Sequence, residues 1–117
     1  MKDFNKINDK LKERRVRRVR AKIFGTALKP RLAVFKSLKH LSVQAIDDDK
    51  SITLASSFDY EVKAKTRQEK ATEVGKLIAK KLLDKKIETA VFDKRHHKYH
   101  GIVKAVADGA REQGLKF

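Results

Sequence analysis

The stretch from residue 14 to residue 22 limits most narrowly what this chain can fold into. Its nine positions hold six basic side chains and no acidic one. A helix with basic groups around most of its circumference has no wide apolar face to bury, and its like charges repel one another. We therefore expect residues 1–30 to form a basic arm and connector outside the core, flexible alone and helical against an anion. The basic residues of the stretch are Arg14, Arg15, Arg17, Arg18, Arg20 and Lys22.

The charge of the whole chain indicates an acidic partner. The 117 residues carry a net charge of +15, and residues 1–31, with 12 basic and 3 acidic side chains, supply +9 of it. Arginine forks pair well with phosphates, so we interpret the arm as a nucleic-acid contact rather than a solvated tail. A membrane surface or a calmodulin-type partner would favour bulky apolar side chains, where the middle of the arm has only valines.

Several classes of protein are excluded by what the composition lacks. Cysteine is absent, so disulfides, thiolate metal sites and thiol catalysis are ruled out. Apolar runs fall far short of the ~20 residues of a membrane span, and no apolar leader follows the charged start. No phosphate-cradling glycine loop or nucleophile elbow occurs. We expect a cytoplasmic binding protein with no enzymatic activity, cofactor, membrane partner or small-molecule substrate.

From residue 31 onward the pattern predicts one globular α/β domain over residues 31–117. Gly25 and Pro30 suggest a hinge-like connector before it. Strand-like alternation is followed by a helix whose apolar face contains Ala71, Val74, Leu77, Ile78 and Leu82, then by a buried strand and a second helix. The first three strands predict an antiparallel meander, and the helix between the third and fourth strands implies a crossover with a parallel pairing. The predicted strands cover residues 31–37, 41–47, 51–56 and 89–93, and the helices cover 66–84 and the region from 103.

Two clusters raise the possibility of metal chemistry. Three histidines lie within residues 96–100, which suggests zinc, but the neighbouring Lys94, Arg95 and Lys98 disfavour a divalent ion. We interpret this loop as a basic, aromatic-bearing contact for RNA. Residues 47–49 are three aspartates, which suggest a metal-dependent nuclease. The first predicted strand carries no acid for such a site, so turn geometry is the better interpretation.

Short motifs follow one another along the chain at residues 25–26, 30–32, 34–37, 40, 44–46, 53–56, 74–76, 92–93, 98–101, 103–105, 107–108 and 110–117. Their order resembles the bacterial L18 family of large-subunit ribosomal proteins, which bind 5S rRNA. The resemblance implies a mixed sheet with the non-catalytic topology of the ribonuclease H-like motif. It also implies a role in attaching 5S rRNA to 23S rRNA in the central protuberance, beside other 5S-binding ribosomal proteins. A general nucleic-acid-binding protein and, much less favoured, a nuclease are the alternatives.

The resemblance also implies which residues contact RNA. Besides the basic residues of the arm, these form a strand-edge surface and a loop that leads into the last helix. The family usually has glycines where this chain has Arg95 and His96, and an arginine where it has Ile102. Glycines would let the backbone approach RNA closely, and Arg95 supplies a cation instead. Ile102 lacks the charge with which the family's arginine would contact a phosphate. Outside the arm, the implied residues are Arg31, Lys36, Ser37, His40, Lys94, Arg95, Lys98, Tyr99, His100, Gly101 and Lys104.

Overall fold

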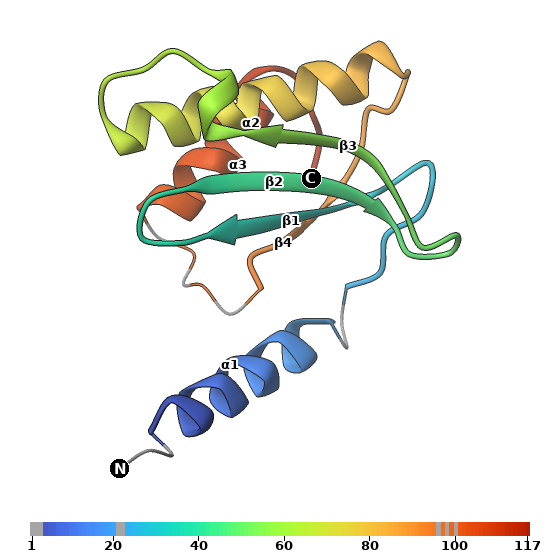
Figure 1. Cartoon of the computed structure of the whole chain (residues 1–117). Helices are drawn as coiled ribbons and strands as arrows, with labels where there is room; N and C mark the ends of the chain where they lie inside the picture. The colour runs from blue at the N-terminus through green and yellow to red at the C-terminus, as the bar shows by residue number, and fades with distance from the viewer. Residues whose placement is uncertain (1–3, 21–22, 96, 98, 100) are drawn as a thin grey trace.

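The computed structural model describes residues 4–20, 23–95, 97, 99 and 101–117. In the first helix, side chains are described only for residues 9–18. After this helix the elements follow the predicted order β-β-β-α-β-α (Figure 1). The mixed α/β class is therefore confirmed, while the likeness to the ribonuclease H-like motif stays a prediction. The elements are α1 (Phe4–Arg20), β1 (Arg31–Lys36), β2 (Leu41–Asp47), β3 (Ile52–Phe58), the 3-10 turn η1 (Asp59–Glu61), α2 (Arg67–Asp84), β4 (Val91–Asp93) and α3 (Ile102–Glu112).

The sheet has the strand order β3-β2-β1-β4. Strands β1, β2 and β3 form the predicted antiparallel meander. The predicted parallel pairing of β4 is confirmed, and its partner is β1. Strand β3 lies at the opposite edge, where the Ser56 carbonyl accepts a hydrogen bond from Lys81 of α2 and the Leu54 carbonyl accepts one from Lys85, which follows that helix. Two backbone carbonyls of β3 are thus bonded to lysine side chains, whereas β4 pairs with the outer edge of β1.

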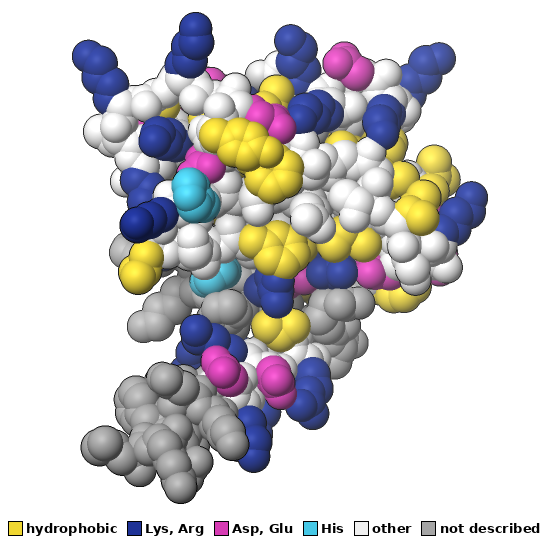
Figure 2. Space-filling view, viewed as in Figure 1, with side chains coloured by type: hydrophobic (Ala, Val, Ile, Leu, Met, Phe, Trp, Pro, Cys, Tyr) yellow, Lys and Arg dark blue, Asp and Glu magenta, His cyan; other side chains and the backbone are white. Residues whose placement is uncertain are grey.

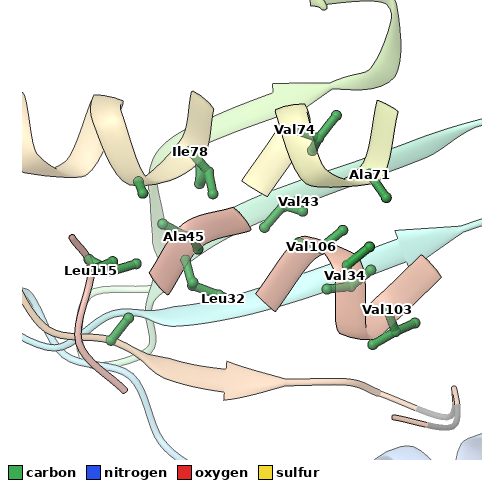
Figure 3. Packing of buried hydrophobic residues seen from close by; sticks show 14 of the residues in the cluster. Leu32, Val34, Val43, Ala45, Ala71, Val74, Ile78, Val103, Val106 and Leu115 are labelled. Carbon is green, nitrogen blue, oxygen red and sulfur yellow. The ribbon is translucent and has the colours of Figure 1, made fainter. Parts of the chain in front are cut away.

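Buried residues of helices α2 and α3 pack against buried residues of the sheet and form the core with them (Figure 3). The predicted apolar face of α2 is buried at Ala71, Val74, Ile78 and Leu82, while Leu77 is only half-buried. The two helices approach closely through glycines, because a Cβ on Gly75 would lie 2.1 Å from a backbone oxygen of α3. A larger residue there would push the helices apart and loosen the core between them and the sheet.

Helix α1 lies apart from α2 and α3, on the other side of the sheet (Figure 1). Its described side chains are exposed except for Val16, which is half-buried, and Leu11 is 41% exposed. Among these described side chains, the helix therefore has no wide buried face, as the sequence predicted. The predicted change from a flexible arm to a helix on binding an anion stays a prediction. In the part of the chain described, no helix combines the length and apolar character needed to cross a membrane.

Candidate nucleic-acid interface

The arginines of α1 are displayed to solvent. Arg14, Arg15, Arg17 and Arg18 are all exposed, and Arg17 forms an ion pair of 3.6 Å with Glu13 one turn earlier. Both side chains of this pair are more than half exposed, so the pair adds little to stability. The four guanidinium groups stay available to a partner on several sides of the helix. For Arg20 only the backbone is described, and Lys22 lies outside the described residues.

The connector after α1 is fixed to the domain, which corrects the prediction of a hinge. The backbone N–H of Gly25 donates to Oδ2 of Asp48 over 2.8 Å, and the N–H of Asp48 donates to the Gly25 carbonyl over 2.9 Å. A Cβ on Gly25 would lie 2.4 Å from both the Arg31 nitrogen and the Ile46 oxygen. Glycine is needed here because the backbone passes so close to the sheet. The connector is therefore held beside the sheet at Gly25.

Arg31 is a buried structural residue, which corrects its prediction as an RNA contact. Its Nη1 lies 2.6 Å from Oδ2 of Asp93, and its Nε lies 3.0 Å from Oδ2 of Asp48. The side chain is 8% exposed, so a phosphate cannot reach the guanidinium without displacing these carboxylates. Burial alone lowers the pKa of Arg31, but hydrogen bonds to Asp48 and Asp93 outweigh it and raise the pKa above its ordinary value. The guanidinium therefore stays charged and joins the connector turn to β4.

The aspartates at 47–49 serve structure, as the sequence analysis favoured. Oδ1 of Asp47 accepts hydrogen bonds from the N–H groups of Asp49 and Lys50, which closes the turn between β2 and β3. Asp48 and Asp93, two of the acids that a nuclease would need, both pair with Arg31. Among the described residues, no three acidic, histidine or cysteine side chains are grouped so that they could hold a metal ion. His96 and His100 of the zinc hypothesis lie outside the described residues.

The loop after β4 begins with a backbone conformation that suits glycine, although this chain has Arg95 there. Arg95 has a φ of 58°, in the left-handed region that glycine adopts at lowest cost. Its N–H donates to Oδ1 of Asp93 over 2.8 Å, and its guanidinium lies 4.4 Å from the ring centroid of Phe35. Lys94 beside it is half-buried, and Lys98 lies outside the described residues. Arg95 is thus held over β1 by a hydrogen bond and a cation–π contact.

Tyr99 is shared between the surface and a small aromatic cluster. The ring is 41% exposed and meets Phe92 edge to face, with centroids 5.7 Å apart. Its hydroxyl accepts a hydrogen bond of 3.1 Å from Arg111, whose guanidinium lies over the ring of Phe117. Tyr99 is therefore held by Phe92 of β4 and Arg111 of α3, and only the exposed part of its ring can make the predicted RNA contact.

The residues that follow Tyr99 start α3. Gly101 precedes the helix with a φ of 57°, and its carbonyl accepts from the N–H of Ala105. Lys104, in the first turn, is exposed. Ile102, which stands where the family has arginine, packs partly against the core and so cannot replace a phosphate contact.

The hairpin between β1 and β2 presents the strand-edge residues. Lys36, Ser37 and His40 are exposed, and Ser37 and His40 hydrogen-bond each other across the turn. Nδ1 of His40 also lies 3.4 Å from Oδ2 of Asp59. The guanidinium of Arg67 donates to two carbonyls of the turn, at Ser37 and Leu38. Arg67 was missed by sequence reasoning because its partners lie about thirty positions earlier in the chain.

The arm, the hairpin and the loop lie close together in the structure. A hollow of about 480 Å³ lies between one face of α1 and Arg95. A second, of about 510 Å³, is lined by Lys12 of α1, by Lys36 and Arg67, and by His97 of the loop. Basic residues from three separate segments therefore border one side of the molecule, although Arg31 is not among them. These features define a small, basic α/β protein whose charge is displayed outside its core.

Comparison with known proteins identifies the family. Residues 6–117 match the model described as ribosomal L18 of archaea, bacteria, mitochondria and chloroplasts. Large ribosomal subunit protein uL18 of Thermotoga petrophila is 54% identical over 110 residues, covering 89% of this chain and 90% of that protein. The protein of the same name from Limosilactobacillus reuteri is 51% identical over 111 residues, covering 93% and 94%. The chain belongs to the L18 family of ribosomal proteins. It is a ribosomal protein and not an enzyme, which confirms the sequence prediction and removes the nuclease alternative.

Proposed function

We propose that this chain binds 5S rRNA and helps attach it to 23S rRNA in the central protuberance of the large ribosomal subunit. Family membership supports the ribosomal setting, and the charge of the chain supports an RNA partner. Neighbouring 5S-binding ribosomal proteins are the further partners, and the cytoplasm is the compartment. One observation carries the proposal: exposed arginines on a helix that contributes little to the core.

The proposed contact surface combines α1 with the hairpin and the loop. Arginine forks bind phosphates in two-point contacts and keep their charge at physiological pH. Folded RNA is recognised by shape, phosphates and stacking, since side chains cannot read the deep major groove of an RNA duplex. The proposed contact residues are Arg14, Arg15, Arg17, Arg18, Arg20, Lys22, Lys36, Ser37, His40, Lys94, Arg95, Lys98, Tyr99, His100, Gly101 and Lys104.

The test compares the affinity of the full chain for three nucleic acids. These are 5S rRNA, an unrelated RNA of the same length and a DNA duplex, each measured over a range of salt concentration. We expect preference for 5S rRNA and a loss of roughly 0.7–0.9 log units of affinity, per log unit of salt, for each neutralised phosphate. Equal affinity for all three would favour a general nucleic-acid-binding protein, and insensitivity to salt would contradict the phosphate contacts.

A further inference from the structure

The open face of the sheet carries aromatic side chains that the core does not use. Phe35 of β1 lies opposite Ser42 of β2, and Ser42 lies opposite Phe58 of β3. The neighbouring positions Val34 and Val43 belong to the core under α2 and α3. Since successive side chains of a strand point to opposite faces, Phe35, Ser42 and Phe58 form a row on the face away from these helices.

The row borders a hollow that a small flat group could enter. Its volume is about 470 Å³, within the range of roughly 300–1,000 Å³ of small-molecule pockets. The small Ser42 side chain between two phenylalanines leaves the middle of the row low. Figure 2 shows hydrophobic side chains exposed beside basic and histidine side chains on this view of the molecule. The lining residues used below are Phe35, Lys36, His40, Ser42, Phe58, Asp59, Tyr60 and Arg95.

Tyr60 provides the most accessible stacking surface of the hollow. Its ring is parallel to that of Phe58, with an angle of 3° between the planes and 5.1 Å between centroids. Tyr60 is 71% exposed, so the face turned away from Phe58 is open to a ligand. At the other end of the row, Arg95 lies over Phe35 and offers a planar cation beside the hollow. Aromatic rings and guanidinium planes are the groups on which unpaired RNA bases stack.

The charge around the hollow favours a nucleotide over an apolar peptide. Lys36 is exposed at the rim and Arg95 adds a second cation, with the exposed His40 ring beside them. The acid of the lining, Asp59, accepts from the N–H of Leu41 and lies near His40. An apolar segment or a second copy of this chain would cover the rings but bring no anion to these cations. A nucleotide satisfies both, with its base on the rings and its phosphate on the rim.

We propose that this aromatic shelf, formed by Phe35, Phe58 and Tyr60, holds one unpaired base of the bound RNA. The inference rests on the proposed function and names a contact within it, formed by rings that the sequence analysis did not single out. Every base has a π face, so the shelf favours an unpaired nucleotide without selecting strongly among the four bases. The arm and loop neutralise phosphates, whereas the shelf binds a base.

The first test measures the affinity of full-length variants for 5S rRNA across salt concentrations. Tyr60→Leu should weaken binding about 5- to 150-fold, which corresponds to the loss of one base–aromatic stack. Its salt dependence should be that of the unmodified chain, because no phosphate contact is lost. Tyr60→Phe keeps the ring and should bind like the unmodified chain. Lys36→Gln, at the rim, should instead make the slope of log affinity against log salt shallower by roughly 0.7–0.9.

The second test follows Tyr60 directly by fluorescence. The chain contains two tyrosines and no tryptophan, so Tyr99→Phe leaves Tyr60 as the sole tyrosine. Titration with a uridine hexanucleotide should quench the emission of Tyr60, whereas polyphosphate of the same charge should not. Equal quenching by both would overturn the shelf, since charge alone would then explain the signal.

The results separate failure of the shelf from failure of the proposed function. If the unmodified chain binds 5S rRNA and Tyr60→Leu binds equally well, the shelf is wrong and the function stands. If the unmodified chain shows no preference for 5S rRNA while the hexanucleotide still quenches Tyr60, the function fails and the shelf stands. Concentration-dependent self-association abolished by Tyr60→Leu, with RNA affinity unchanged, would identify a second copy as the occupant and overturn the proposal.

Discussion

Helices α1 and α2 are similar in length but use their basic residues differently. Helix α1 has 17 residues with eight basic and two acidic side chains, and α2 has 18 residues with five basic and three acidic. In α2, residues such as Ile78 and Leu82 are fully buried against the sheet, while Lys80 is exposed and Lys81 donates to the Ser56 carbonyl of β3. The described side chains of α1 are exposed apart from Val16. A basic helix therefore indicates a partner only when its remaining face is not needed by the core.

Removing residues 1–22 tests this difference most severely. If the five arginines at 14, 15, 17, 18 and 20 each neutralise one phosphate, the slope of log affinity against log salt becomes shallower by about 3.5–4.5. In 0.1 M salt the affinity for 5S rRNA should fall by about four orders of magnitude. The cut lies before Gly25, whose bonds to Asp48 keep the connector attached. Thermal denaturation should show a cooperative, folded domain, and an unfolded product would contradict a peripheral α1.

Arg31→Met should separate a structural arginine from the arginines of the arm. It leaves Asp93, whose side chain is 0% exposed, without its cation, and should lower the free energy of unfolding by about 3–5 kcal/mol. Lys36→Met, on the same strand but exposed, should change it by less than about 0.5 kcal/mol. Urea denaturation measures both. Equal stability of the two variants would show that the buried pairs of Arg31 do not hold the connector.

The raised pKa of Arg31 also predicts how its contribution depends on pH. A cation whose pKa is raised by folding stabilises the native state fully below its unfolded pKa. That contribution is lost only as the pH rises through the folded pKa, which lies far above the physiological range. The stability difference between the unmodified chain and Arg31→Met should therefore be constant from neutral to mildly alkaline pH. A difference that disappears in this range would contradict the assigned charge state.

The same substitution in each helix sharpens the comparison of their packing. Leu82→Ala removes a fully buried side chain of α2 and should cost about 2–5 kcal/mol in the free energy of unfolding. Leu11→Ala in α1 removes a side chain that is 41% exposed and should cost less than about 0.5 kcal/mol. Denaturant titration of both variants gives the two values. A large loss for Leu11→Ala would place α1 within the cooperative core.

Single charge removals give the smallest effect and the finest comparison. Arg14→Gln in α1 should weaken binding to 5S rRNA about 5- to 8-fold in 0.1 M salt, as expected for one phosphate contact. Lys80→Gln, at an exposed position of α2, should change it less than about 2-fold, because this face lies outside the proposed interface. Filter binding or fluorescence anisotropy resolves this difference. A similar loss in both variants would extend the RNA-binding surface over α2.

Local patterns predicted much of the fold because local physics decides it. Thr66 accepts a hydrogen bond from the N–H of Glu69 at the start of α2, as expected of a capping residue, and the spacing of Val74 and Ile78 marks the buried face. The alternation in β2 matches its alternate burial. The parallel pairing of β4 was predicted, but its partner β1 was not, because pairing at a sheet edge depends on which edge is still free. That depends on contacts across the fold, such as those of Lys81 and Lys85 with β3.

The site was only partly predictable, for the same reason. Exposed arginines in α1 follow from charge density, which is visible in the sequence. The burial of Arg31 depends on Asp48 and Asp93, which lie 17 and 62 positions away, and no local pattern announces those pairs. The aromatic shelf could be predicted from the sequence only in part. Phe35 directly follows the core residue Val34, and successive side chains of a strand point to opposite faces. This alternation could have placed the Phe35 ring on the open face.

The pairing of Arg31 with Asp93 has a consequence for a chain still being synthesised. The connector can bind Asp48 soon after the first hairpin forms, but the second carboxylate arrives 62 residues after Arg31. Until β4 is made, Arg31 is only half paired, and the Asp93 carboxylate that accepts from the N–H of Arg95 is missing. The pairing of Arg31 and the first turn of the basic loop are therefore both completed only when Asp93 of β4 has been synthesised. A truncated nascent chain would display the arginines of the arm before the basic loop after β4 exists.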